Sequence, residues 1–225
     1  MKKWISLSLL IASIMLMSFA LNKKKKVVFF GDSITQMGAD KGGYIRLMEE
    51  LIQSENLSNE FELVGAGIGG NKVTDLFLRL EKDVLSQQPD ILVIYVGIND
   101  IWHKRLSGTG TDYAKFASFY DVIVKKLQAA KIKVIVCTPS VIGERKDHSN
   151  EQDGELNFYS NWIRTYAKSN QLPCVDLRNE FQQYLIANNP SNEEKGLLTT
   201  DRVHLNAKGN LLVAQAVWKE LKAIK

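Results

Sequence analysis

Cysteine is scarce in this 225-residue chain, so disulfides contribute little to any prediction of its fold. Only Cys137 and Cys174 are present. Each falls in an expected strand, and an offset of two or three residues between neighbouring parallel strands would separate them by about 7–10 Å. A disulfide does not span such a gap. Both residues are therefore expected to be buried free thiols.

An excess of positive charge is also lacking once the first residues are set aside. The formal net charge is +4, but residues 1–26 hold six lysines and no acidic residue. The remaining chain carries 23 basic and 25 acidic side chains, a net charge of −2. A nucleic-acid-binding surface needs clustered basic residues. The composition therefore argues against nucleic acid as a partner.

No internal repeat, low-complexity tract or interdomain linker interrupts the chain after residue 26. Its 45% hydrophobic and 24% charged residues are typical of a globular protein. A stretch of about 200 residues is long enough to bury one substantial core. We therefore expect a single domain over residues 27–225.

The N-terminal segment has the composition of a targeting sequence. Two lysines precede an apolar run from Ile5 to Leu21, and small residues lie at the −3 and −1 positions of a cut after Ala20. This layout predicts a signal peptide over residues 1–20, a basic linker over residues 21–26, and a secreted or periplasmic protein. Four lysines directly after the apolar run favour the cytoplasmic side. The alternative is an uncleaved anchor, through which alone the protein would contact a membrane.

Short apolar runs alternate with stretches of helical spacing along the rest of the chain. The runs are 27–30, 61–64, 91–96, 134–137 and 174–177; the helical stretches are about 43–55, 71–86, 112–130, 155–169 and 206–223. This alternation predicts a parallel sheet with helices on both faces. Right-handed crossovers would then place all strand-to-helix loops at one edge, where ligands bind in open α/β sheets.

Three glycines after the second expected strand spell G-x-G-x-x-G, a pattern typical of dinucleotide sites. They are Gly65, Gly67 and Gly70. A dinucleotide fingerprint belongs in the first strand-to-helix turn and needs an acidic residue at the end of the next strand. Here Asp90 precedes the next strand, at the opposite edge. The alternative is that glycine lets a backbone N–H approach a ligand such as a developing oxyanion.

Polar residues follow several expected strands and precede the last helix. Ser33 follows the first strand in "FFGDSIT", Asn99 follows the third strand in "YVGIND", and Asp201 and His204 lie three residues apart in "TTDRVHLN". Each has a simpler explanation: a helix cap, a turn asparagine or a chance pair. Together with the glycine donor, they supply every role that acyl transfer requires.

Four sequence blocks resemble those of the SGNH hydrolases, also called GDSL esterases and lipases. The blocks are "FFGDSIT", "GAGIGGN", "YVGIND" and "DRVHLNAKG". The resemblance runs from about residue 27 to the end of the last helix. Gly65 is a departure, since members often have Asn there. The resemblance implies a flavodoxin-like three-layer α/β/α sandwich whose five-stranded parallel sheet has the order 2-1-3-4-5.

The resemblance also implies the roles of the site residues. Ser33 would be the nucleophile, His204 the general base and Asp201 the group that orients the imidazole. The oxyanion hole would comprise the N–H groups of Ser33 and Gly67 and the side-chain amide of Asn99. The protein would be a serine carboxylic ester hydrolase with no metal and no cofactor.

Two acidic residues and two histidines lie near these blocks in the sequence. We expect Asp32 to pin the turn that carries Ser33, and Asp100 to brace the Asn99 loop. His103 and His148 are expected in long loops at the rim of the pocket, most simply as solvated residues.

The substrate is not determined by the sequence. Candidate binding residues after the third strand are Trp102, His103 and Tyr113, the aromatic ones suited to stacking on a sugar or packing an acyl chain. Lys104, Arg105 and Arg145 could contact an anionic group. A carbohydrate or acetyl esterase acting on a small-molecule or glycan ester is the first expectation. The alternatives are a lysophospholipase or lipase, a thioesterase-type acyl hydrolase, an acyltransferase and, last, a non-catalytic binding module.

Overall fold

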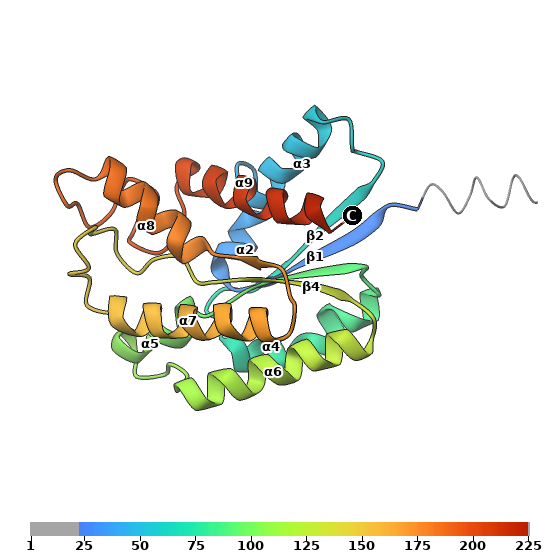
Figure 1. The fold of residues 1–225 in the computed structure, drawn as a ribbon, viewed down its shortest axis with the longest axis horizontal. Helices are drawn as coiled ribbons and strands as arrows, with labels where there is room; N and C mark the ends of the chain where they lie inside the picture. Colours follow the sequence, from blue (N-terminus) through green and yellow to red (C-terminus); the bar gives the residue numbers. More distant parts are fainter. Residues whose placement is uncertain (1–22, 225) are drawn as a thin grey trace, which may run out of the picture.

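The computed structural model describes residues 23–224, which form a three-layer α/β/α sandwich (Figure 1). The five strands are all parallel and lie in the order β2-β1-β3-β4-β5. Both the predicted fold class and the predicted strand order are confirmed. The expected signal peptide, residues 1–20, and the first two linker residues lie outside the described residues.

The strands correspond to the five apolar runs, with shifted ends. They are β1 (Lys25–Gly31), β2 (Phe61–Gly67), β3 (Ile91–Tyr95), β4 (Lys133–Cys137) and β5 (Cys174–Val175). Strand β1 begins two residues before its apolar run because Lys25 and Lys26 pair with Phe61 and Glu62. Both lysines were predicted in the linker, and the backbone ladder extends the strand through them.

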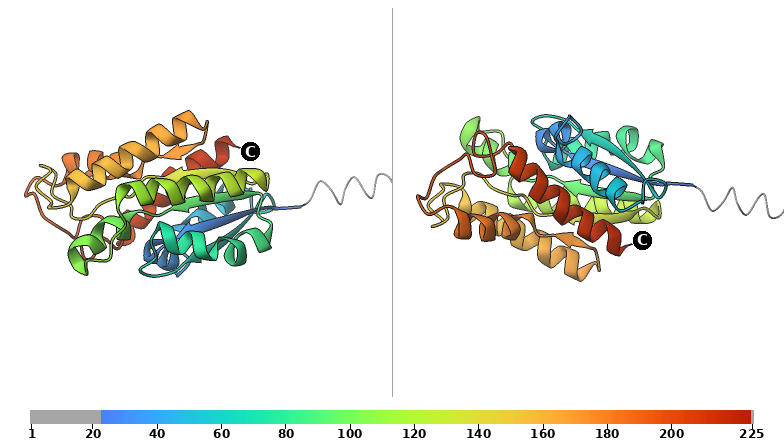
Figure 2. Two further views of the ribbon diagram at one scale, coloured as in Figure 1. Left: turned by 90° about the horizontal axis from the view of Figure 1, so that it is seen from below. Right: turned by 90° about the horizontal axis from the view of Figure 1, so that it is seen from above.

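Helices cover both faces of the sheet, as the two turned views show (Figure 2). One layer holds α2 (Ser33–Gly38), α3 (Tyr44–Ser54), α8 (Leu177–Asn188) and α9 (Ala207–Ala223). The other holds α4 (Val73–Asp83), the short η1 (Leu85–Gln87), α5 (Ile98–Leu106), α6 (Tyr113–Ala129) and α7 (Asp153–Ser169). None of the helices within residues 23–224 is both long and apolar enough to cross a bilayer.

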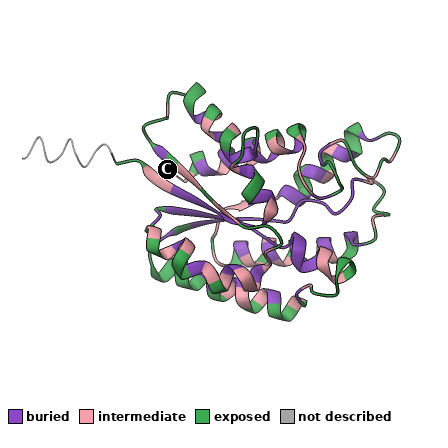
Figure 3. Cartoon of the chain, turned by 180° about the vertical axis from the view of Figure 1, so that it is seen from behind, coloured by how far each residue is buried: buried purple, intermediate pink, exposed green. Residues whose placement is uncertain are grey.

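The core lies on both faces of the central strands (Figure 3). Every residue of β3 is buried, as are Val27–Gly31 of β1. Burial on both faces explains why these strands read as continuous apolar runs rather than alternating ones. Each fully buried Val, Ile, Leu or Phe stabilises the fold by about 1.5–3 kcal/mol relative to an exposed side chain.

Helix α9 begins as the sequence predicts, at an Asn206 cap. The Asn206 side chain accepts hydrogen bonds from the N–H groups of Lys208 (2.9 Å) and Gly209 (3.1 Å). Gly209 has a steric role, since a Cβ there would lie 2.1 Å from the carbonyl oxygen of Leu198. The first turn of α9 therefore packs directly on the backbone that precedes it.

Two longer helices, α5 and α8, were not predicted. The first four residues of α5, Ile98 to Ile101, are all buried, so its sequence lacks an amphipathic period. Helix α8 follows a strand of only two residues and is capped by Asp176, whose carboxylate accepts from Asn179 N at 3.3 Å. The α5 segment was predicted as a loop, and of α8 only Leu177 was assigned, to a strand.

The two cysteines are free thiols, as predicted, although their predicted offset is wrong. Cys174 pairs with Val136, one residue before Cys137, so the offset is one residue rather than two or three. Neighbouring strand positions point to opposite faces of a sheet. This orientation keeps the thiols apart. Cys137 is buried, whereas Cys174 is only partly buried.

Candidate active site

The turn after β1 presents Ser33 as the first residue of α2. Asp32 caps this helix, its Oδ1 accepting from Ile34 N at 3.0 Å. Gly31 is required sterically, because a Cβ there would lie 2.3 Å from the Thr35 hydroxyl oxygen. The strand therefore passes directly into a short helix, with Ser33 partly exposed at its tip.

The glycines of the second block serve close packing around this turn. A Cβ on Gly67 would lie 2.1 Å from the backbone N of Gln36. Strand β2 can therefore lie this close to α2 only if residue 67 is glycine. Gly69 donates its N–H to Gln36 Oε1 at 2.7 Å, and a Cβ there would lie 3.9 Å from that of Ser33. Gly70, with φ +76°, turns the chain away. This glycine loop therefore lies beside Ser33.

Asn99 is brought to the same edge by the turn after β3. Gly97 has φ 129°, a conformation that glycine adopts readily. The Asn99 side chain is 2% exposed, and its Nδ2 donates to the Asn71 carbonyl at 3.1 Å. Because an amide carries two N–H groups, this bond holds the side chain and uses one of them.

His204 connects Ser33 to Asp201. Its Nε2 lies 3.0 Å from Ser33 Oγ, across 171 residues of sequence. Its Nδ1 lies 2.6 Å from Asp201 Oδ2, and its backbone N–H donates to Asp201 Oδ1 at 2.8 Å. The carboxylate therefore holds both the ring and the backbone of the histidine. This geometry is suited to proton transfer between hydroxyl and imidazole.

Burial affects the carboxylates around the site in different ways. Burial raises the pKa of Asp32 to about 7, with Asp100 adding to the rise, and burial raises the pKa of Asp100 to about 6. Partial burial alone would raise the pKa of Asp201, but hydrogen bonds from the His204 ring and from the N–H groups of His204 and Val203 lower it overall. Asp201 is thus held ionised beside the imidazole.

Asp100 contacts the helix that follows the glycine loop. Its two carboxylate oxygens each lie 3.2 Å from Val73 N, at the first turn of α4. The prediction that Asp100 braces the Asn99 loop stays a prediction, and this contact supports it. Asp32 likewise occupies the position expected for a residue that pins the Ser33 turn.

Glu144 holds the segment that leads to Asp201 and His204, a role that no local feature of the sequence predicts. Its side chain is fully buried and accepts from Leu197 N (2.7 Å), Leu198 N (2.8 Å) and the Thr199 hydroxyl (2.7 Å). Thr199 N donates to it as well. An acidic residue in the loop after β4 carries no local pattern that announces partners more than 50 positions away.

Arg79 of α4 is a second residue near the site that was not predicted from the sequence. Its guanidinium donates to the carbonyls of Gly31 (2.7 Å) and Ala66 (2.9 Å), and its Nε donates to Asn71 Oδ1 (2.7 Å). One side chain therefore joins the ends of β1 and β2 to the glycine loop. Its place three residues after Leu76 on an amphipathic helix is the only sequence hint that it faces the sheet.

The structure separates the predicted substrate-binding residues. The Trp102 ring centroid lies 6.0 Å from that of His204, in an edge-to-face arrangement. His103 lies in helix α5 rather than in a loop, near Gly70, and partial burial lowers its pKa. The Tyr113 ring contacts those of Phe158 (4.4 Å) and Tyr159 (5.8 Å) instead of the His204 ring. His148 is exposed in the loop after β4, as expected.

A cleft of about 410 Å³ is lined by Trp102, whose ring centroid lies 6.0 Å from that of His204, and by Arg202, the residue after Asp201. A larger hollow, about 720 Å³, lies around Lys25, Asp90 and Lys133 at the opposite edge of the sheet, far from these residues. Of these two clefts, only the smaller one has lining residues next to His204 or Asp201. Within residues 23–224, no group of three or more His, Cys, Asp or Glu side chains could hold a metal ion.

Comparison with known proteins identifies the family. The GDSL-like lipase/acylhydrolase family matches residues 29–212. A crystal structure of the acetyl xylan esterase AlAXEase is 55% identical, with a TM-score of 0.85, over 86% of this chain and 98% of that one. An acetylxylan esterase of Geobacillus stearothermophilus is 28% identical over 88% of this chain and 94% of that protein. The GDSL esterase/lipase CPRD49 of Arabidopsis thaliana is 21% identical over 88% and 79%.

The match covers most of the described domain and includes all four sequence blocks. The predicted resemblance is therefore confirmed. The chain belongs to the GDSL-like lipase/acylhydrolase family and is a carboxylic ester hydrolase.

Proposed function

We propose that this protein removes acetyl groups from carbohydrate esters through an acyl-enzyme. Ser33 Oγ attacks the acetyl carbonyl while His204 Nε2, 3.0 Å away, takes its proton. Asp201 fixes the imidazole tautomer and stabilises the imidazolium. The contact between Ser33 and His204 is the observation that carries the proposal.

The oxyanion of the tetrahedral intermediate accepts hydrogen bonds from three donors: the N–H groups of Ser33 and Gly67 and the Nδ2 of Asn99. Collapse breaks the bond to the sugar oxygen, which leaves with the proton from His204. Acetyl-Ser33 remains. Water then attacks it, His204 takes one water proton, and acetic acid is released as that proton passes to Ser33; the acid then ionises in solvent.

Support for the carbohydrate substrate comes from the relatives. Two of the similar proteins, at 55% and 28% identity, are acetylxylan esterases, and the chain covers nearly their full lengths. The proposed location is outside the cytoplasm, since the N-terminal segment has a signal-peptide layout. Residue 23 leads into the amino end of β1, so a preceding segment joins the domain at the edge opposite Ser33.

The test is hydrolysis of p-nitrophenyl acetate and acetylated xylan by the wild type and by Ser33→Ala. The variant should lose activity by about four orders of magnitude or more while keeping its circular dichroism spectrum and Tm. A fluorophosphonate probe should label the wild type at Ser33 and leave the variant unlabelled. A fully active Ser33→Ala protein would refute the nucleophile assignment, and an unreactive wild type would favour a binding module.

A further inference from the structure

The cleft beside His204 is more polar and more positive than an acyl-chain pocket would be. Its apolar lining is limited to Trp102, Leu106 and Ile142, whereas Arg105, Arg145 and Arg202 contribute three guanidinium groups. Two carboxylates, Glu151 and Glu194, offset part of this charge and leave the lining at +1 (three positive, two negative). Residues 27–225 as a whole carry −2, so the cleft has the opposite sign to the body around it.

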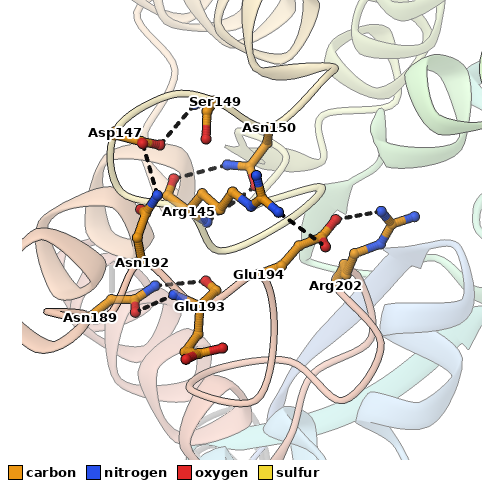
Figure 4. A network of polar contacts seen from close by, with 9 residues as sticks. All are labelled: Arg145, Asp147, Ser149, Asn150, Asn189, Asn192, Glu193, Glu194 and Arg202. Atoms are coloured by element: carbon orange, nitrogen blue, oxygen red, sulfur yellow. Dashed lines mark hydrogen bonds and ion pairs between the residues drawn. The ribbon is translucent and has the colours of Figure 1, made fainter.

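The three arginines differ in how closely they pair with carboxylates. Arg202 Nη1 lies 2.6 Å from Glu194 Oε1, whereas Arg145 Nη2 lies 3.7 Å from the other oxygen of the same carboxylate (Figure 4). Arg105 pairs with Glu151 at 3.2 Å, with both side chains about two-thirds exposed. Exposed pairs of this kind contribute only about 0–1 kcal/mol. Arg105 and Arg145 can therefore exchange their present partners for a ligand at small cost.

Lys104, a candidate for contact with an anionic group, and Tyr113, a candidate for contact with a sugar ring or an acyl chain, are engaged elsewhere. The Lys104 ammonium lies 3.0 Å from the Tyr159 hydroxyl and pairs with Glu155 at 2.5 Å. Tyr113 packs against the aromatic rings of α7. The positive charge next to the catalytic histidine is thus supplied by guanidinium groups, which bind carboxylates in a bidentate, planar manner.

Arg202 connects the cleft to the catalytic turn. It lies between Asp201 and His204 and has φ 87°, a left-handed conformation that costs a residue with a side chain about 1–3 kcal/mol. Its carbonyl accepts from Gly143 N at 2.9 Å, and its side chain binds Glu194. The strained turn therefore presents the Arg202 side chain to the cleft while holding His204 beside Ser33. Arg202, which lines the cleft, is therefore one residue from Asp201 and two residues from His204.

We propose that this cleft binds the carboxylate of an acidic sugar, such as a uronic acid side group, on the acetylated glycan. Trp102 supplies an aromatic surface for the sugar ring, and Arg105 and Arg145 bind the carboxylate. The proposal rests on the proposed deacetylase function and specifies its substrate. It also explains why a cleft next to the nucleophile has so little apolar lining for a fatty acyl chain.

A matched pair of substrates tests the proposal. One is an acetylated xylo-oligosaccharide that bears a uronic acid; the other is the same compound after reduction of its carboxyl group to an alcohol. The wild type should show a kcat/KM about tenfold higher for the acidic compound, the value of one charge-assisted hydrogen bond. This ratio should fall as salt is raised from 0.05 to 0.5 M, because added ions screen the exposed arginines.

The variant is the double exchange Arg105→Gln and Arg145→Gln, which removes both charges and keeps shorter, polar side chains that can still donate hydrogen bonds. In this variant, the kcat/KM for the acidic compound divided by that for the reduced compound should fall to about one. Arg46→Gln is the matched control, since Arg46 is an exposed arginine paired with Glu49 outside the cleft. The control should keep the wild-type ratio.

The outcomes separate this proposal from the function on which it rests. A wild-type ratio near one, or an unchanged ratio in the double variant, would refute the acidic-sugar site while leaving the deacetylase intact. Faster hydrolysis of a lysophospholipid than of either oligosaccharide would also refute it and would assign the arginines to a phosphate headgroup. Failure of the wild type to hydrolyse any ester, p-nitrophenyl acetate included, would contradict the proposed function itself.

Discussion

The two halves of the site are built in different ways. Ser33, Gly67 and Asn99 lie at or just after the carboxyl ends of β1, β2 and β3, three adjacent strands whose register is fixed by backbone pairing. Asp201 and His204 lie on the irregular segment between α8 and α9, residues 189–206. All of this segment is described, and its only β pairing is an isolated bridge between Thr199 and Leu205. The half with the proposed nucleophile, Ser33, is part of the sheet, whereas the half with the proposed base, His204, is attached to it; we call them the nucleophile half and the base half.

The attachments of the base half are few and specific. Glu144 holds Leu197–Thr199, Gly143 donates to the Arg202 carbonyl, and Asn206 caps α9. The nucleophile half is held instead by strand pairing, by tight glycine contacts and by Arg79. The position of the base relative to the nucleophile therefore depends on side-chain hydrogen bonds more than on the sheet. Substitutions in the two halves should therefore differ in their effects on kcat, stability and hydrogen exchange.

The largest difference should appear in Asp201→Asn. An amide cannot hold the same imidazole tautomer, and the loss of the corresponding carboxylate in a serine hydrolase can cost about 10⁴ in kcat. We expect a fall of about 10³–10⁴ in kcat for p-nitrophenyl acetate, with little change in Tm because Asp201 is half-exposed. Asp40→Asn, an exposed residue, is the control. A variant within tenfold of the wild type would show that His204 is oriented by other contacts.

Asn99→Ala tests the nucleophile half. Loss of one oxyanion donor costs about 10²–10³ in kcat, with little change in KM. Because Asn99 is buried and bonded to Asn71, some loss of stability should accompany the kinetic effect. Steady-state kinetics at several ester concentrations separate kcat from KM. An effect confined to KM would argue against a role in stabilising the oxyanion.

Glu144→Gln should affect the base half alone. One carboxylate oxygen is replaced by a donor, which leaves buried N–H groups of the 197–199 segment without an acceptor at about 1–3 kcal/mol each. We expect kcat to fall by about 10–100-fold, as His204 is held less often beside Ser33. Amide hydrogen exchange should accelerate in residues 196–204 and stay unchanged in β1 and β3.

Two further measurements distinguish positioning from a general loss of stability. The exposed Glu50→Gln on α3 serves as the control and should behave as the wild type. In Glu144→Gln, hydrolysis should remain slower than in the wild type when the assay temperature is lowered by 10 °C, so that all of the variant is folded. Uniformly faster exchange across the sheet would mean that Glu144 supports the whole fold rather than the base segment.

The same contrast explains which parts of the site could be predicted from the sequence. Ser33, Gly67 and Asn99 follow apolar strands, and parallel strands end at one edge, so local patterns predict their convergence. His204 was placed by its spacing to Asp201 and by the resemblance of its block to a family. Glu144 and Arg79 escaped prediction because each acts through backbone groups far away in the chain. Such contacts leave no spacing or periodicity in the sequence.

Helices α5 and α8 escaped prediction for a different reason. Helix α5 buries its first turn at the site, where Asn99 and Asp100 are polar and fully enclosed. A helix whose buried residues include an amide and a carboxylate has no apolar stripe to detect. Functional constraint on the residues after β3 therefore masks the secondary structure that carries them.

The smallest effect on turnover is expected for Asp32→Asn, which tests the burial of charge beneath the nucleophile. Asparagine can keep the cap on Ile34 N, so kcat should stay within about threefold of the wild type. The change should appear in the pH dependence of stability. An unfolded aspartate ionises near pH 4, whereas burial raises the folded pKa of Asp32 to about 7.

Between these values the folded state binds a proton that the unfolded state has released, so the contribution of Asp32 is present below pH 4 and is lost as pH rises to 7. Urea unfolding at intervals from pH 4 to 7.5 should show a free energy of unfolding that falls with pH less steeply in Asp32→Asn, by up to about 1.4 kcal/mol per pH unit. Asp100, with a pKa of about 6, keeps a residual slope in both proteins. Identical slopes would mean that Asp32 is ionised in the folded protein across this range, and that the Ser33 turn tolerates a buried negative charge that the sheet must compensate.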